Sequence, residues 1–367
     1  MKKIAIAVPN FLGNEKKYVQ DCMDTVWISS VGKYIKQFED AFAQRFGVKE
    51  AIACSNGTVA LHLALMAIDI QAGDEVLVPS FTYIATANAV RYCGAKPVFV
   101  DCLKDTWNMD PADMAAKCTS KTKAVVPVHL YGNPCDMDPI MTVAKEKGLF
   151  VIEDAAECHG ATYKGNLAGT IGDIGTFSFF GNKIITTGEG GMVVTNNEKL
   201  AEKIRLLKGQ GQDPHRRYWF IETGYNYRMT NIEAAIGLAQ LENIDEHIAH
   251  RKRVALQYDN YFKGHSAVIP QVITPGADSV HWMYSLLLEN EGKITRDELM
   301  ERLAEDGIET RPLFYPMHIM PPFFDEKAAC PVAEDISARG MNIPTHSLLS
   351  EEDIAYVAER ILHYTEK

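Results

Sequence analysis

A lysine at position 183 stands in an unusual setting. The segment TFSFFGNKIITTGEGGMVV, residues 176–194, has apolar ends typical of buried strands and a glycine-rich centre that contains Lys183. Lysine is rarely buried unless it is paired or takes part in chemistry. Burial lowers the pKa of the amine, and a neutral amine is a nucleophile able to form a Schiff base. A loop-tip lysine with a solvated head group is the other interpretation of this segment.

A second group of residues fits the binding of an anion. The apolar segment AIACS (51–55) is followed by Asn56, Gly57 and Thr58, and then by the helical pattern GTVALHLALMAI. The first turn of a helix offers free backbone N–H groups, which suit a phosphate. A simple helix cap is the alternative reading of the same residues.

Two further apolar segments lead to residues whose side chains can bind a ligand or take part in a reaction. EVLVP (75–79) is followed by Tyr83, whose ring is expected either to stack on a ligand or to pack in the core. LFVIED (149–154) ends in Asp154. A carboxylate there needs a cationic partner, such as a protonated pyridine nitrogen, unless it caps a helix or forms a structural ion pair.

Together these residues match the requirements of pyridoxal phosphate. The lysine forms the Schiff base, the carboxylate keeps the ring nitrogen protonated, and the ring acts as an electron sink. In parallel α/β sheets, ligands bind beyond the carboxyl ends of the strands, which is where these residues are expected. No G-x-G-x-x-G follows an early strand and no Walker lysine motif occurs, so a dinucleotide enzyme is disfavoured.

The elements that position these residues follow an alternating pattern. From residue 50 onward, short β-rich segments alternate with helical patterns, which predicts a mostly parallel sheet covered on both faces. Residues 174–195 interrupt this rhythm with two strands and no long helix between them. A long helical stretch, 230–262, leads to a smaller α+β domain. We expect a large domain over 1–244, with an N-terminal helical segment, and a small domain over 245–367.

Composition excludes several classes of protein. The chain has 367 residues and a net charge of −11, which disfavours nucleic-acid binding. Its eight cysteines form no C-x-x-C pair, and neither a metal site nor a disulfide framework is expected. The N-terminal apolar run is too short for a signal peptide and no run is long enough to span a membrane, so a cytoplasmic protein is expected.

Four longer motifs resemble one known family. VIEDAA (151–156), TFSFFGNKIITTGEGGMV (176–193), WISSVGKYIKQFE (27–39) and GYNYRMTNIEAAIGLAQL (224–241) resemble the nucleotide-sugar aminotransferases of the DegT/DnrJ/EryC1/StrS family. The resemblance covers nearly the whole chain. It implies an aspartate-aminotransferase-type fold (fold type I), a homodimer with shared active sites, and pyridoxal 5′-phosphate as cofactor, with the aminated PMP form as intermediate.

The resemblance also implies roles for individual residues. Lys183 is the Schiff-base lysine and proton carrier, Asp154 pairs with the pyridine nitrogen, and Tyr83 stacks on the ring. Glu157 stands where the family has Gln or Glu near the ring hydroxyl. The residues implied in phosphate binding are Gly57, Thr58, Ser178 and, from the partner subunit, Asn226.

Within the family, the chain is most similar to sugar C4 aminotransferases of the perosamine type. The motifs are RRYW (216–219), GYNYRMTN and ETRPLFYPMH (309–318). The implied reaction moves the amino group of L-glutamate to the C4 ketone of a GDP-linked 4-keto-6-deoxy sugar for surface polysaccharide (O-antigen) synthesis. Phe220, where perosamine enzymes often carry histidine, and the atypical Thr345 and His346 leave UDP- and dTDP-linked (viosamine-type) substrates open.

A further set of residues is expected to bind the nucleotide sugar. The alternative is a surface or structural charge for the cationic candidates. It is core packing for Trp27, Tyr315 and His318. His62 and His129 are expected to be structural. The substrate candidates are Trp27, Ser29, Lys33, Arg228, Arg311, Tyr315 and His318.

Three rival functions remain. A dehydratase of the same fold would carry histidine in place of Lys183. A non-catalytic sensor would have lost part of the cofactor set, all of which is present here. A nicotinamide enzyme would need the missing glycine fingerprint.

Overall fold

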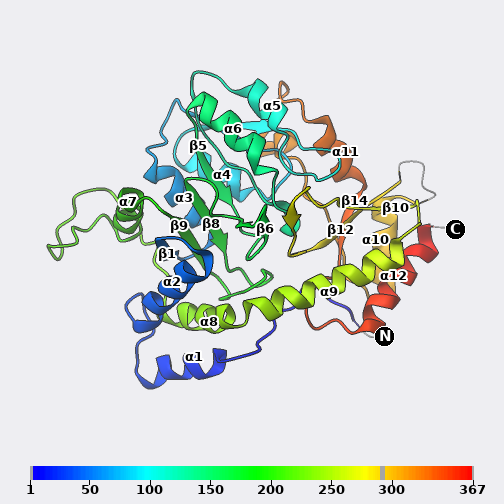
Figure 1. The fold of residues 1–367 in the computed structure, drawn as a ribbon, viewed down its shortest axis with the longest axis horizontal. Helices are drawn as coiled ribbons and strands as arrows, with labels where there is room; N and C mark the ends of the chain where they lie inside the picture. The colour runs from blue at the N-terminus through cyan, green and yellow to red at the C-terminus, as the bar shows by residue number, and fades with distance from the viewer. Residues whose placement is uncertain (1–2, 290–293, 366–367) are drawn as a thin grey trace.

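A mixed seven-stranded sheet forms the centre of the region predicted to be the large domain (Figure 1). The chain is described by a computed structural model that covers residues 3–289 and 294–365. Strands β8 to β3 of this sheet are parallel to one another, and β9 runs antiparallel to both of its neighbours. The strands lie in the order β1 (Glu50–Cys54), β9 (Gly191–Thr195), β8 (Ile174–Ser178), β5 (Phe150–Asp154), β4 (Thr122–Val125), β2 (Glu75–Pro79) and β3 (Lys96–Val100). This is the mostly parallel α/β sheet that the alternating pattern predicted.

Helices cover both faces of the sheet because successive strand residues point to opposite sides. In β2, Leu77 packs in the cluster that contains α5 and α6, whereas Val76 and Val78 pack in the cluster that contains α3 and α4. The helices of this domain are α1 (Glu15–Asp24), α2 (Lys33–Phe46), α3 (Gly57–Ala67), α4 (Ala85–Tyr92), α5 (Pro111–Lys117), α6 (Met137–Lys147), α7 (Glu198–Lys208) and α8 (Asn231–Glu242).

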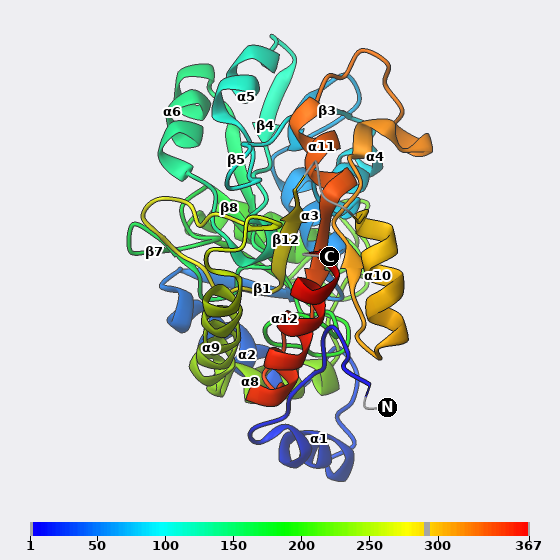
Figure 2. The ribbon, with the colours of Figure 1, turned by 90° about the vertical axis from the view of Figure 1, so that its right-hand side faces the viewer.

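The helical stretch predicted over 230–262 consists of two helices. A capping box begins α8: Thr230 accepts from the Glu233 N–H while the Glu233 carboxylate accepts from the Thr230 N–H. Non-helical dihedral angles at Asn243 separate α8 from α9 (Ile244–Phe262). Figures 1 and 2 show α9 running from the large domain to the second sheet, where it lies beside α12.

A second, antiparallel sheet follows α9. Its core also takes in Ile4, which forms a β-bridge with Ile308, so the start of the chain packs against the C-terminal part. The division at 244/245 remains a prediction. The last helix of the chain ends at Thr365, and residues 366–367 lie outside the described ranges. The elements here are β10 (Val268–Pro270), β12 (Tyr284–Leu288), β14 (Gly340–Ile343), β13 (Arg311–Pro312), α10 (Arg296–Glu305), α11 (Pro331–Arg339) and α12 (Glu351–Thr365).

Shorter elements connect these two parts. None of the helices in the described ranges is long and apolar enough to cross a bilayer. The remaining elements are a small sheet of β11 (Ala277–Asp278), β6 (Thr162–Tyr163) and β7 (Asn166–Leu167), and the 3₁₀ turns η1 (Leu130–Gly132), η2 (Met317–Ile319) and η3 (Pro321–Phe323).

An aromatic cluster holds β8, the strand that leads to Lys183. Phe38, Phe42 and Phe46 recur every four residues of α2 and therefore share one face of the helix. This face packs on Phe177 of β8, with ring centroids 5.1 Å from Phe42 and 4.9 Å from Phe46. The packing of α2 thus fixes the position from which the chain enters the site.

Removal of the Phe177 ring is expected to destabilise the fold. Because Phe177 is fully buried, Phe177→Ala should lower the free energy of unfolding by about 3–5 kcal/mol, through lost burial and a residual cavity. Guanidinium denaturation followed by tryptophan fluorescence would measure the loss. Phe324, which is exposed, supplies the control: Phe324→Ala should change stability by at most about 0.5 kcal/mol. Equal effects would contradict this role for the cluster.

Candidate active site

The Lys183 side chain is largely buried beside an aromatic ring and a carboxylate. It belongs to the loop between β8 and β9, residues 179–190, which we call the lysine loop. Its Nζ is 3.8 Å from the centroid of the Trp282 ring and 3.7 Å from Oε1 of Glu157. Only 11% of the side chain is exposed. Burial lowers the pKa of Lys183, and the charges of Glu157 and Asp154 partly oppose that shift. The structure therefore favours the reactive amine over the solvated loop tip.

Glu157 is the closest acidic neighbour of this amine. It is buried, and its Oε2 accepts a hydrogen bond of 2.7 Å from the main-chain N–H of Tyr131. Burial raises the pKa of Glu157 to about 7, although the charge of Lys183 acts in the opposite direction. The carboxyl group can therefore exchange a proton near neutral pH.

Asp154, the last residue of β5, has polar neighbours but no ion pair within 3–289 and 294–365. Its Oδ2 accepts from the Thr86 hydroxyl at 2.9 Å, and its Oδ1 accepts from the Ala156 N–H at 3.2 Å. Burial raises the pKa of Asp154 despite these two hydrogen bonds. A protonated ring nitrogen beside it would provide the charge that stabilises the ionised carboxylate.

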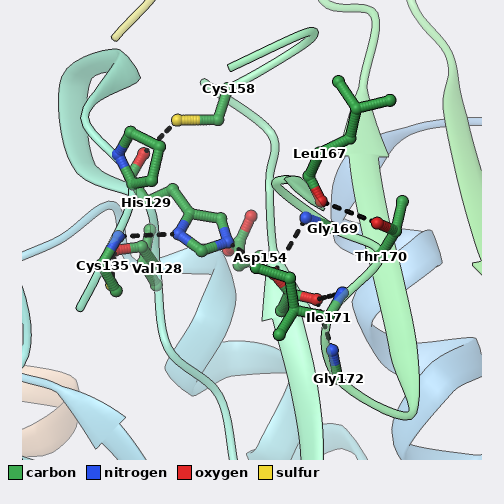
Figure 3. Close-up of polar contacts among 12 residues, drawn as sticks. Val128, His129, Cys135, Asp154, Cys158, Leu167, Gly169, Thr170, Ile171 and Gly172 are labelled. Carbon is green, nitrogen blue, oxygen red and sulfur yellow. Dashed lines mark hydrogen bonds and ion pairs between the residues drawn. The ribbon is translucent and has the colours of Figure 1, made fainter. Parts of the chain in front are cut away.

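The preceding carboxylate, Glu153, points to the other face of the sheet and serves the structure. Its oxygens accept from the main-chain N–H groups of Gly169, Ile171 and Gly172 at 2.6–2.9 Å. Its Oε2 also lies 2.9 Å from Nε2 of His129. Figure 3 shows His129 hydrogen-bonded to the Cys135 N–H beside the loop that carries Gly169 and Gly172. These contacts agree with the structural role expected for His129.

The first turn of α3 lies against the end of β8. A Cβ atom built at Gly57 would stand 2.7 Å from Cβ of Ser178, so glycine is required for this close approach. Asn56 caps the helix by accepting the Val59 N–H at 2.9 Å. Thr58 follows Gly57 in the same turn. Hydroxyl groups and free N–H groups from two elements therefore meet at one place, which suits a phosphate.

A row of aromatic rings connects Tyr83 with the lysine. Tyr83 is 59% exposed and its ring centroid is 5.9 Å from that of Phe314. Phe314 stacks on Tyr131 at 5.2 Å, and Tyr131 lies parallel to Trp282 at 6.3 Å. The open ring of Tyr83 is available to a ligand. Sequence reasoning missed Thr86, Tyr131, Trp282 and Phe314, because no local pattern separates them from core residues.

Two of the predicted phosphate and substrate residues lie apart from Lys183 in the described contacts. Asn226 is exposed, and its Oδ1 accepts hydrogen bonds from Arg228 at 3.1 and 3.3 Å. Neither side chain has a contact with the residues around Lys183 in the described parts of the chain. Their roles remain predictions, and for Asn226 the prediction requires a partner subunit.

The N-terminal candidates occupy the surface before and at the start of α2. Trp27 and Ser29 are exposed, and their main-chain carbonyls accept from Asn231 of α8. Lys33 forms an ion pair of 2.7 Å with Asp21. All three side chains are accessible, and their contacts with a sugar nucleotide remain predictions.

The C-terminal candidates differ in their accessibility. Arg311 is exposed and lies 3.6 Å from Glu309, and Tyr315 is also exposed. His318, in contrast, is only 2% exposed, and its ring nitrogens contact Ser80 Oγ at 2.7 Å and Glu334 Oε1 at 3.1 Å. The prediction that His318 lines the sugar pocket is not supported: its ring packs inside and is engaged at both nitrogens.

The set of groups fits pyridoxal 5′-phosphate. A sheltered amine, a carboxylate without an ion pair among the described residues, an exposed ring and an anion cradle stand at the carboxyl ends of β5, β8 and β2 and at the start of α3. A Cβ atom at Gly57 would clash with Ser178, so the two elements that form this anion cradle are tightly packed. The aldehyde, the ring nitrogen, the ring face and the phosphate of the cofactor each have a complementary group in this chain.

Comparisons with known proteins agree with this assignment. A GDP-perosamine synthase of Caulobacter vibrioides is 56% identical over 357 residues, 96% of both chains. One of Escherichia coli O157:H7 is 51% identical over 363 residues, 98% of both. A putative sugar aminotransferase of Streptococcus pneumoniae, solved in its PMP-form, superposes with a TM-score of 0.95 at 28% identity, covering 100% of this chain and 98% of that one.

The family model of the DegT/DnrJ/EryC1/StrS aminotransferases matches residues 11–362. Its match leaves only short terminal stretches unaligned. Together with the geometry around Lys183 and the two relatives above 50% identity, it shows that this chain belongs to the DegT/DnrJ/EryC1/StrS aminotransferase family.

Proposed function

We propose that this enzyme transfers the amino group of L-glutamate to the C4 ketone of GDP-4-keto-6-deoxy-D-mannose and forms GDP-perosamine for surface polysaccharide (O-antigen). The observation that carries the chemistry is the meeting of Lys183, Asp154 and the first turn of α3 at one edge of the sheet. The names of the two relatives at 56% and 51% identity support the choice of sugar and nucleotide.

Pyridoxal 5′-phosphate supplies the electron sink for this exchange when it is bound. Asp154 would hold the proton on the ring nitrogen, and Tyr83 would cover one face of the ring. Gly57, Thr58 and Ser178 would bind the phosphate through N–H and hydroxyl groups. These assignments follow from the donor and acceptor chemistry of each residue.

Lys183 moves the protons of the reaction. It takes the proton from Cα of glutamate in the first half and delivers a proton to C4 of the sugar in the second. The C–N bond of glutamate breaks and a C–N bond forms at C4. Overall, the amino group of glutamate and the C4 ketone oxygen of the sugar change places, and glutamate leaves as 2-oxoglutarate. The exchange needs no external oxidant. The lowered pKa of Lys183 leaves a larger fraction of its amine neutral than in a solvated lysine.

The exposed apolar residues support a homodimer. The segment that follows α7 projects from the body of the protein in Figure 1 and carries the exposed residues Tyr218, Trp219, Phe220 and Ile221. Monomeric proteins rarely expose contiguous apolar patches of this kind. In the proposed dimer this surface is covered by a second copy, and Asn226 reaches the phosphate in the partner's site.

The choice of nucleotide can be tested directly. Purified enzyme with pyridoxal phosphate and L-glutamate would receive 4-keto-6-deoxy sugars carried on GDP (manno), UDP (gluco) or dTDP (gluco). We expect 2-oxoglutarate release with the GDP sugar at a kcat/KM at least ~10-fold above the others, since nucleotide-specific polar contacts discriminate by 1.4 kcal/mol or more. Faster turnover of the UDP or dTDP sugar would replace the perosamine assignment with a viosamine-type one.

The role of Lys183 predicts a specific loss. Lys183→Ala should lower turnover by roughly 10²–10⁴-fold or more, because the proton carrier is absent. Borohydride reduction followed by peptide mass spectrometry should fix the cofactor to Lys183 in the wild type only. Lys208 is a matched control, since it is also sheltered and lies 3.1 Å from a carboxylate, Glu39. Lys208→Ala should keep the cofactor link; a variant at 183 with normal turnover would refute the assignment.

Glu157 predicts a pH-dependent stability of the cofactor-free protein. Its pKa is about 7 in the fold against 4.5 as the ordinary value. The folded state therefore binds an extra proton between these values, and stability falls as pH rises through this window. The substitution Glu157→Gln, which introduces a neutral side chain, should remove this loss of stability at high pH. Urea denaturation at pH 5 and pH 8 should show the variant gaining stability on the wild type by up to roughly 3 kcal/mol at the higher pH; an equal difference at both pH values would contradict the shift.

A further inference from the structure

A buried cation on α9 has no role in the site described above. Arg251 is 5% exposed, and burial lowers its pKa to about 10, which still leaves it charged at neutral pH. Within residues 3–289 and 294–365 no carboxylate forms an ion pair with it; its hydrogen bonds go to main-chain carbonyls. A guanidinium without a carboxylate is costly to bury, so an apolar side chain would serve the core better unless the cation has a task.

The three carbonyl groups that Arg251 contacts belong to three distant segments. Nη1 donates to the carbonyl oxygens of Trp282 at 2.9 Å and Thr345 at 2.8 Å. Nη2 lies 3.4 Å from the carbonyl oxygen of Lys183. Trp282 precedes β12 and Thr345 follows β14, which are neighbouring strands. One side chain therefore joins the lysine loop to the second sheet.

The anchoring segments are themselves firmly held. The Thr345 hydroxyl accepts from the Tyr284 N–H at 2.8 Å and donates to the carbonyl oxygen of Ile343 at 2.8 Å. The Tyr258 hydroxyl, about two helical turns beyond Arg251 on α9, donates to the carbonyl oxygen of Pro344 at 3.0 Å. Arg251 thus connects Lys183 to a rigid part of the fold.

Trp282 makes a second connection to the same loop. Its indole N–H donates to the carbonyl oxygen of Asn182 at 2.7 Å, and its ring faces the Lys183 ammonium group at 3.8 Å. Two successive carbonyls of the lysine loop, at 182 and 183, are therefore both bound from the side of the second sheet. The direction in which the Lys183 side chain leaves the main chain depends on these two contacts.

From these contacts we propose that Arg251 is a positioning residue, whose guanidinium group holds the main chain of Lys183 to Trp282 so that the amine stays between the indole ring and Glu157. The inference rests on the proposed function, because it takes Lys183 as the reacting residue. Displacements of about 1 Å at a reacting group lower rates by up to ~10²-fold. Loss of this contact should therefore impair proton transfer without removing a substrate contact.

Two variants separate the hydrogen bonds of Arg251 from its charge. Arg251→Met removes both, whereas Arg251→Lys keeps a cation that has a single donor centre instead of the planar fork. Arg296 provides a control of similar burial, since it is 7% exposed and its Nη1 donates to the carbonyl oxygens of Ser337 at 3.1 Å and Gly340 at 3.0 Å. Unlike Arg251 within the described ranges, it also pairs with a carboxylate, Asp297, at 2.5 Å. Arg296→Met should lower the melting temperature without any effect on the lysine loop.

The first measurement is kinetic and uses the holoenzyme. Both variants at 251 should lower kcat by about 10- to 100-fold, with KM for glutamate and sugar nucleotide within about threefold of the wild type. The circular dichroism of the bound cofactor's visible band should weaken in both, because the orientation of the cofactor relative to the protein changes. Arg296→Met should keep kcat within about twofold and retain the band.

The second measurement needs no cofactor. Acetylation of Lys183 in the apoenzyme, quantified by peptide mass spectrometry across a pH series, reports the titration of the amine. Charged or titratable groups acting on Lys183 include Glu157, Asp154 and Cys158. Release of the loop lets water reach the amine, so the midpoint should move toward the ordinary pKa of lysine in both variants at 251. In Arg296→Met it should stay at the wild-type value.

Defined outcomes overturn the inference. If Arg251→Lys keeps the wild-type kcat and acetylation midpoint, the charge rather than the carbonyl contacts matters, and the proposal is wrong. The same holds if Arg251→Met and Arg296→Met have equal effects on kcat. Failure of the proposed function looks different: borohydride would then fail to fix the cofactor to Lys183 in the wild type itself.

Discussion

The burial of the Lys183 amine is the constraint on which the rest of this structure depends. An ammonium group in a sheltered pocket is unfavourable unless nearby groups stabilise it or the amine loses its proton. Here the indole ring of Trp282 and the carboxyl group of Glu157 lie within 4 Å of it. Burial is also unfavourable for the ionised form of Glu157 and raises the pKa of that group to about 7. Burial therefore moves the pKa values of the two groups toward each other, which favours proton exchange between them.

The central sheet positions Asp154 and the anion cradle at the same edge as this amine. Because side chains alternate along β5, Glu153 and Asp154 point to opposite faces of the sheet. The two carboxylates differ in the number of hydrogen-bond donors around them. Three main-chain N–H groups and His129 satisfy Glu153, whereas among the described residues a hydroxyl and one N–H donate to the Asp154 side chain. The first carboxylate stabilises a loop, and the second remains available to a ligand. The close approach of Gly57 to Ser178 adds the anion cradle at the same edge.

The lysine loop is also supported from outside the large sheet. Trp282 and Arg251 bind two successive carbonyls of this loop, and both residues connect it to the second sheet. The position of the second sheet relative to the first is therefore part of the geometry of the active site. The aromatic row from Trp282 through Tyr131 and Phe314 to Tyr83 extends this support across the site.

The sequence by itself determined the alternating α/β class, the mostly parallel sheet, the family and the chemistry expected of Lys183 and Asp154. These features rest on local patterns: strand and helix periodicity, and motifs whose residues are close together in the chain. It also predicted 230–262 as one helical stretch, but the non-helical geometry at Asn243 divides it. Only the tertiary structure decided which residues surround the amine. Trp282 and Arg251 lie 99 and 68 positions from Lys183 in the chain, and His318, predicted to meet the sugar, is instead held between Ser80 and Glu334. Such contacts depend on how whole elements pack against one another, and no local pattern of residue types carries that information.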